Sequence, residues 1–253
     1  MKRILFISYL VLIAFVGNVM AQNANQKEYK ATVFGVKSDG ITNNTASIQK
    51  AIDFISEQGG GTLAFYVGRY LTGGFELKSN VKIKIASGAV LVSSSNIYEY
   101  KGANGQNALI YANGQENIGI EGVGTIDGTA ILLAEHAKDQ YAKGYVKNES
   151  EALPAMIYFD NCKNVTVKQI TTQNYKTTAQ NYKNCKDVKI ENLYFFNKKI
   201  GAPAWSFSGC EGVVATDCYL DTKVEPLVSD GTSTGLSFTK CITPAGKKVS
   251  ASK

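Results

Sequence analysis

The chain has 253 residues, with 27 Lys and Arg against 21 Asp and Glu, a formal net charge of +6 and five cysteines. Only Arg3 and Arg69 are arginines, so lysine supplies nearly all of the positive charge. Proteins that read nucleic acids rely on the planar arginine side chain, so this composition argues against a nucleic-acid partner. No Cys-x-x-Cys pair occurs, and we expect no metal and no other cofactor.

The first 21 residues have the pattern of a secretory signal peptide. Lys2 and Arg3 precede an apolar run from Ile4 to Val16, and a small-residue cleavage site ends at Ala21. No stretch reaches the roughly 20 apolar residues that a membrane helix needs. We therefore expect an exported monomer in a periplasm, on a cell surface or outside the cell, with residues 22–253 as one domain.

A helix is predicted early in this domain. Thr45 can cap it, Ile48, Ile52 and Ile55 fall on one face, and the triplet Gly59–Gly61 ends it. Such an apolar face must be buried, and we expect it to cover the open end of the repeats that follow.

The later part of the chain carries an internal repeat. Cys162, Cys185 and Cys210 are 23 and 25 residues apart, and a valine follows each of them three residues later. Apolar and polar residues alternate within each unit, as in Val188 and Ile190, which is typical of a strand with one buried face. Units of the same shape occur upstream, beginning with Lys78-Ser79-Asn80-Val81 and Gln115-Glu116-Asn117-Ile118.

Short strands repeated at this interval stack only if the chain coils once per repeat, with strands about 4.8 Å apart. The predicted fold is therefore all-β: a single-stranded right-handed parallel β-helix with an N-terminal capping helix. The three cysteines should form one inward column, and Cys218 and Cys241 a second. We expect free thiols, because stacked neighbours seldom present the dihedral angle of a disulfide. Asn174 and Asn197 should form a turn ladder.

Residues 129–154 break the period. They carry His136, Tyr141 and Tyr145, and we predict a long loop inserted between coils.

Four longer stretches resemble a known family. They are FGVKSDGITNNTASIQKAIDFISEQGGGTL, YLTGGFELKSNVKIKIASGAVLVSS and ALIYANGQENIGIEGVGTIDG, between Phe34 and Gly128, and AMIYFDNCKNVTV from Ala155. In the order of its motifs the chain is similar to the amino-terminal half of polygalacturonases, the family 28 glycoside hydrolases of the pectate-lyase-like β-helix superfamily. The resemblance implies a glycoside hydrolase that acts on pectin-type acidic polysaccharide, of galacturonan or rhamnogalacturonan type.

The resemblance places the catalytic residues in later coils, where this chain departs from the family. Inverting hydrolysis uses two sets of carboxyl groups about 6.5 to 9.5 Å apart. Family members carry them in an Asn-Thr-Asp motif and an Asp-Asp pair, followed by Gly-His-Gly and Arg-Ile-Lys. Here the acid positions hold Gly201–Pro203 and Val224–Glu225. The single histidine, His136, lies in the inserted loop, and Arg69 lies near the capping helix.

Three functions remain open. A hydrolase with a rebuilt site would use Glu225 with Asp221 or Asp230 as general acid or base. A non-catalytic glycan-binding β-helix would use aromatic rings and lysines, namely Trp205, Tyr182, Tyr219, Lys198, Lys199 and Lys223. A β-elimination lyase would need Ca²⁺, and no cluster of acids suited to Ca²⁺ occurs.

The candidate catalytic residues are therefore Glu225 and Asp221. The candidate substrate-binding residues are Trp205, Lys199 and Lys223, and no metal site is expected.

Overall fold

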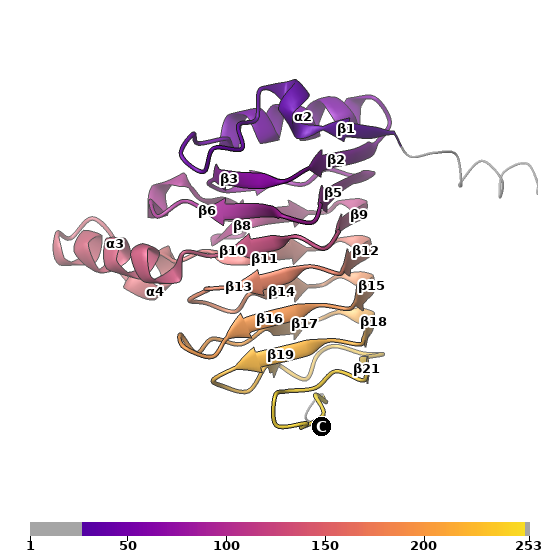
Figure 1. Ribbon diagram of the computed structural model, residues 1–253. Coiled ribbons are helices and arrows are strands. Elements are labelled where there is room, and N and C mark those ends of the chain that lie inside the picture. The colour runs from indigo at the N-terminus through magenta and orange to yellow at the C-terminus, as the bar shows by residue number, and fades with distance from the viewer. Residues whose placement is uncertain (1–26, 251–253) are drawn as a thin grey trace, which may run out of the picture.

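The computed structural model describes residues 27–250, and the predicted signal peptide lies outside them. The chain forms a right-handed parallel β-helix, so the predicted fold class is confirmed. Three parallel sheets run along the stack (Figure 1). Among the described residues, no helix has the length and apolar character needed to cross a bilayer.

Within residues 27–250 the strands are arranged as follows. Sheet A contains β1 (Glu28–Lys30), β2 (Gly61–Phe65), β5 (Val81–Ile85), β9 (Glu116–Glu121), β12 (Lys163–Lys168), β15 (Lys186–Glu191), β18 (Glu211–Thr216) and β21 (Ser237–Thr239). Sheet B contains β3 (Gly68–Thr72), β6 (Ala89–Ser93), β10 (Thr125–Asp127), β13 (Thr171–Gln173), β16 (Tyr194–Asn197) and β19 (Tyr219–Thr222). Sheet C contains β4 (Phe75–Glu76), β8 (Gln106–Asn113), β11 (Ala155–Asp160), β14 (Gln180–Lys183), β17 (Trp205–Ser208) and β20 (Leu227–Ser229), and β7 (Lys101–Ala103) pairs antiparallel with β8.

The register of sheet A follows the repeat. Val165 pairs with Val188, and Val188 pairs with Val213 in the next coil. These residues point inward and are buried, because the alternation of each strand places every second side chain inside the stack. Their burial supplies the hydrophobic core that holds successive coils together.

The cysteines line the interior as predicted. All five are free and buried. The Sγ atoms of Cys185 and Cys210 each donate to a carbonyl of the preceding coil, that of Phe159 at 3.4 Å and that of Tyr182 at 3.3 Å. The pKa of the Cys185 thiol is raised, because it exchanges hydrogen bonds with Cys162 and Cys210 and because it is buried.

The capping helix is α2 (Thr45–Glu57), and it lies over the amino end of the stack (Figure 1). Its inner face carries three fully buried isoleucines, as predicted: Ile48, Ile52 and Ile55. Thr45 is the first residue of the helix rather than its cap. Its backbone N–H donates to Asn43 Oδ1 at 2.9 Å, so Asn43 satisfies one of the open donors of the first turn.

The predicted ladder of Asn174 and Asn197 is wrong. Asn174 donates to Asp127 at 3.1 Å, whereas Asn197 is buried and accepts the backbone N–H of Tyr175 at 3.2 Å. An asparagine ladder instead lies at the amino ends of the sheet A strands β5, β9 and β12. It consists of three residues with positive φ angles whose side chains bond in sequence, Asn164 to Asn117 at 2.7 Å and Asn117 to Asn80 at 2.9 Å.

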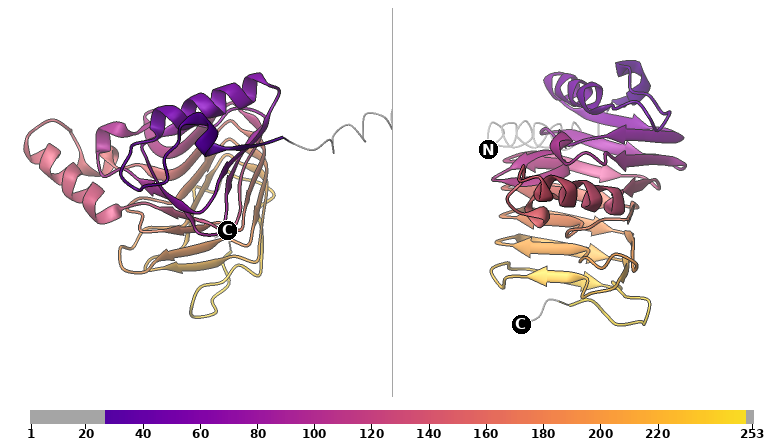
Figure 2. Two further views of the ribbon diagram at one scale, coloured as in Figure 1. Left: turned by 45° about the horizontal axis from the view of Figure 1, so that its top comes forward. Right: turned by 90° about the vertical axis from the view of Figure 1, so that its left-hand side faces the viewer.

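Residues 129–154 contain helices, not the predicted long loop. They form α3 (Ala130–Ala142) and α4 (Glu149–Ala152), which project from the side of the stack (Figure 2). Ala130, Leu133 and Ala137 are buried, which is the spacing of one helical face. Two 3₁₀ turns complete the described helices, η1 (Ala31–Phe34) and η2 (Ile97–Glu99).

Candidate functional site

The turns that join sheet B to sheet C lie along one edge of the molecule, the left edge in Figure 1. We refer to this edge as the turn edge. Beside α2 this edge carries a groove, and in the middle it carries the α3–α4 insertion. Toward the carboxyl end it consists of three short turns: residues 174–179, 198–204 and 223–226. We refer to these three segments as the short turns.

The short turns are stacked directly on one another. Ala179 N donates to Pro203 O at 3.0 Å, and Ala204 N donates to Pro226 O at 2.9 Å. The Lys223 side chain lies against Gly201, where an added Cβ would be 3.2 Å from Lys223 Cδ. Gly201 has a φ of +81°, so the turn and the close approach both favour glycine there.

Four lysines project from the short turns. They are exposed and make no ion pair with any described residue: Lys176, Lys198, Lys199 and Lys223. The predicted residues Lys199 and Lys223 therefore lie in adjacent coils, while Lys176 and Lys198 extend the same positive edge. Like charges on neighbouring turns repel, so an anionic chain laid along them lowers their electrostatic energy.

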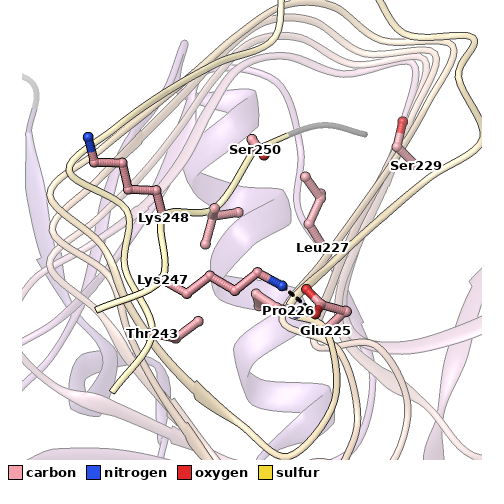
Figure 3. A pocket seen from close by; sticks show the side chains of 9 residues that line it. Glu225, Pro226, Leu227, Ser229, Thr243, Lys247, Lys248 and Ser250 are labelled. Carbon is pink, nitrogen blue, oxygen red and sulfur yellow. Dashed lines mark hydrogen bonds and ion pairs between the residues drawn. The ribbon is translucent and has the colours of Figure 1, made fainter. Parts of the chain in front are cut away.

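Glu225 begins the approach to β20 and is the carboxylate of the short turns (Figure 3). Its side chain is 73% exposed and forms an ion pair with Lys247 at 2.5 Å. The two residues line a pocket of about 280 Å³ that also includes Thr243 and Val249. An exposed ion pair of this kind contributes little to stability, so Lys247 can move aside for a ligand.

The predicted acids Asp221, Glu225 and Asp230 lie on different elements. Asp221 lies on β19 in register with Phe196, while Glu225 is bonded to Lys247. Asp230 follows β20 and accepts a hydrogen bond from Ser208 of the preceding coil. Hydrogen bonds from Ser208 and Thr232 lower the pKa of Asp230 to about 2, so it stays ionised and cannot serve as a general acid.

The assignment of Trp205 to substrate binding is wrong. Trp205 is fully buried, and its indole N–H donates to Gln180 Oε1 at 3.1 Å. Tyr182 is also buried in the core. Neither ring can therefore contact a polysaccharide.

Other aromatic side chains take the outward positions beside the lysines. Tyr194 and Phe196 are 45% and 44% exposed on the outer face of sheet B, and Tyr219 lies in the next coil in register with Tyr194. The rings of Phe196 and Tyr219 are 6.1 Å apart. Tyr219 was among the predicted aromatic residues, whereas Tyr194 and Phe196 were not. Their alternation with buried Leu193 and Phe195 was the signal that could have identified them.

The outer face of sheet C is partly closed. The hairpin of β7 and β8 folds over it, and Asn104 donates to Asp160 Oδ2 at 2.5 Å. Asp160 is 1% exposed and also accepts the hydroxyl of Tyr158 at 3.2 Å. Burial, reinforced by this carboxylate, raises the pKa of Tyr158 to about 12. The hairpin therefore covers β11, while outward residues of later sheet C strands, such as Lys183 and Val228, stay exposed.

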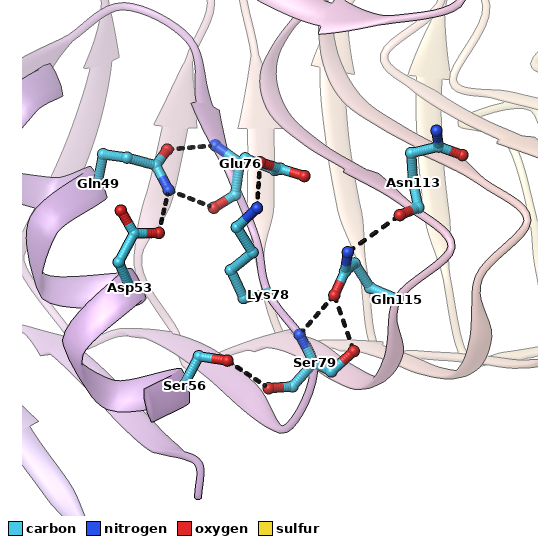
Figure 4. A network of polar contacts seen from close by, with 8 residues as sticks. All are labelled: Gln49, Asp53, Ser56, Glu76, Lys78, Ser79, Asn113 and Gln115. Atoms are coloured by element: carbon cyan, nitrogen blue, oxygen red, sulfur yellow. Dashed lines mark hydrogen bonds and ion pairs between the residues drawn. The ribbon is translucent and has the colours of Figure 1, made fainter. Parts of the chain in front are cut away.

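The groove beside α2 has a volume of about 700 Å³. Gln49 organises its wall by accepting the Glu76 N–H at 2.7 Å and donating to Asp53 at 2.9 Å (Figure 4). Lys78 is bonded to the Glu76 carboxylate. No group of three or more His, Cys, Asp or Glu is arranged for a metal ion anywhere in residues 27–250.

The architecture is therefore a parallel β-helix with exposed lysines on its short turns and exposed aromatic rings on sheet B. Residues 61–224 match the family model for glycosyl hydrolases family 28, and the chain belongs to that family. This confirms the resemblance seen in the sequence.

Similar sequences and structures support this family membership. A candidate glycosyl hydrolase from Parabacteroides merdae is 49% identical, with a TM-score of 0.87 over 90% of this chain and 100% of its own. An exo-poly-alpha-D-galacturonosidase of Dickeya chrysanthemi is 32% identical to this chain. The matched region covers 49% of this chain and only 24% of that relative's length. The family 28 exopolygalacturonase of Yersinia enterocolitica shares the fold at 18% identity, with a TM-score of 0.77 over 87% of this chain and 50% of its own.

Proposed function

We propose that this family 28 protein binds a pectin-type acidic polysaccharide, of galacturonan or rhamnogalacturonan type, along the short turns. The observation that carries the proposal is the set of four exposed lysines without ion-pair partners among the described residues. A polyuronate carries one carboxylate per sugar ring, and a ring is about as long as the spacing between coils. A chain parallel to the stack can therefore place successive carboxylates near successive lysines.

Aromatic rings support the same proposal. Phe196 and Tyr219 lie on the strands that lead directly into two of the lysine-bearing turns. Their apolar faces can pack against sugar rings while the lysines hold the carboxylates. Such polysaccharides occur outside cells, which agrees with the export that we infer from the first 21 residues.

Hydrolysis is the second candidate function, and Glu225 is the observation that favours it. Glu225 lies in the short turns, where the family resemblance places catalytic acids. Hydrolysis of the family type needs a second set of carboxyl groups, whereas the other acid position of the family holds Gly201–Pro203 here. We therefore expect binding with slow cleavage or none.

One experiment separates the two functions. The mature chain is run through affinity gels that contain polygalacturonic acid or rhamnogalacturonan, and reducing ends and unsaturated products are followed in parallel. We expect retardation by at least one polymer, and a loss of about tenfold in affinity for the double variant Lys199→Glu/Lys223→Glu. Lys163→Glu, an exposed lysine on sheet A, is the control and should bind normally.

The outcomes of the gel and product assays distinguish binding, hydrolysis and elimination. Equal retardation of the double variant and Lys163→Glu would contradict the proposed binding surface. Reducing ends that vanish in Glu225→Gln would establish hydrolysis, and unsaturated products would indicate a lyase.

A further inference from the structure

We propose that the groove beside α2 is a separate carbohydrate subsite, and that it takes a short run of neutral sugar units rather than uronates. It is lined by residues of α2, β4, η2, β7 and β8, at the amino end of the turn edge. The α3–α4 insertion lies between the groove and the short turns (Figure 1). The inference therefore does not depend on the lysines of the short turns.

The charges of the groove favour a neutral ligand. Its lining holds three lysines and three carboxylates: Lys50, Lys78, Lys101, Asp53, Glu76 and Glu99. A uronate would meet as much repulsion as attraction there, in contrast to the short turns. A sugar hydroxyl both donates and accepts, so it can use carboxylates and ammonium groups together.

Tyr98 supplies a prepared surface for a sugar ring. Its side chain is 57% exposed, yet its position is fixed by two contacts from α3. The hydroxyl donates to Gln140 Oε1 at 2.9 Å, and the ring meets His136 edge-on, with centroids 5.9 Å apart. An aromatic ring that is already held in place loses little conformational freedom when a ligand packs on its face.

The polar groups of the groove are also held in place. Glu99 accepts from Asn43 at 2.5 Å, and Asp53 accepts from Gln49 at 2.9 Å. In each carboxylate these bonds fix the orientation and leave lone pairs for a ligand. The volume of about 700 Å³ is within the range of small-molecule sites and suits two or three sugar units.

The test measures binding of uncharged trisaccharides to the mature protein. Galactotriose, arabinotriose and xylotriose are titrated by calorimetry and by ligand-observed NMR, with trigalacturonate as the charged counterpart. We expect at least one neutral trisaccharide to bind, and Tyr98→Ala to weaken it about tenfold. Tyr145→Ala is the matched control, because Tyr145 is 72% exposed and lies outside the groove lining.

The double variant Lys199→Glu/Lys223→Glu distinguishes this inference from the proposed function. It should lose polygalacturonate and keep the neutral trisaccharide, whereas Tyr98→Ala should do the reverse. The inference is overturned if none of the three neutral sugars binds, if Tyr98→Ala binds them as the Tyr145→Ala control does, or if trigalacturonate is the preferred ligand of the groove.

Discussion

Single inward positions carry the stability of the coils. Val188 pairs with a valine in the coil on either side and is 1% exposed, so its methyl groups contact only other apolar atoms of the core. Its neighbour Lys189 points outward and pairs with Glu191 at 2.9 Å. Two adjacent residues of one strand therefore differ completely in their tolerance of charge.

We expect Val188 and Lys189 to respond very differently to replacement by aspartate. Val188→Asp buries a carboxylate without a partner and should destabilise the fold by about 4 kcal/mol or more, which prevents accumulation of native protein. Lys189→Asp changes an exposed position and should alter the free energy of unfolding by less than about 1 kcal/mol. Circular dichroism and urea unfolding measure both. Normal melting of Val188→Asp would contradict the register.

Inward and outward positions also explain which site residues the sequence could predict. The repeat identified the columns of Cys162 and Val165, because apolar residues at a fixed interval leave a direct trace in the sequence. Trp205 was placed on the surface because its chemistry suits sugar binding, although its strand alternation puts it inside. The lysines Lys199 and Lys223 are exposed as expected, because turn residues are exposed whatever the exact register, and their role in binding stays a prediction.

At the scale of elements, the asparagine ladder joins the amino ends of three neighbouring sheet A strands. Asn80, Asn117 and Asn164 all have positive φ angles, from 53° to 64°, which asparagine tolerates better than most residues. Their amides bond along the stack, so Asn117 is held by an asparagine in the coil on either side.

Two substitutions separate these contributions. Asn117→Ala loses the amide bonds and must adopt a left-handed conformation, so it should destabilise the protein by about 1 to 2 kcal/mol. Asn117→Gly loses only the bonds and should cost about half as much. Denaturant unfolding measures both. A glycine variant less stable than the alanine variant would contradict the assigned backbone strain.

The helices of the insertion show where element prediction failed. Residues 129–154 interrupt the repeat, so the strand periodicity that organises the rest of the chain gives no information there. Leu133 and Ala137 are four residues apart, which is a helical spacing, but two apolar residues are too few to predict a helix. The η2 turn against which α3 packs could not be predicted from the sequence. The pairing of Asn104 with Asp160 depends on a hairpin folding over a sheet, which no local pattern reveals.

At the scale of the whole molecule, the two proposed binding regions should differ in their response to salt. The Debye length falls from about 10 Å at 0.1 M to about 3 Å at 1 M ionic strength, which screens exposed charges. Polygalacturonate binding to the short turns should therefore weaken by about tenfold or more over this range. Neutral trisaccharide binding at Tyr98 should change by less than about twofold.

Calorimetric titration at both salt concentrations measures this difference. Salt-independent binding of polygalacturonate would mean that the lysines do not hold it. A steep salt dependence for the neutral sugar would place that ligand among charges rather than on the Tyr98 ring.

The turn edge affects which substitutions and insertions the protein can accept. Its connections between sheets B and C range from the pair Gly73–Gly74 to the whole of residues 128–154, yet the strands on either side keep their register. Exposed positions along that margin, such as Lys199 and Lys223, can change without disturbing the interior, whereas Leu133, Tyr175 and Ala179 belong to the core. Ligand preference can therefore diversify at the exposed positions without any compensating repair of the coils.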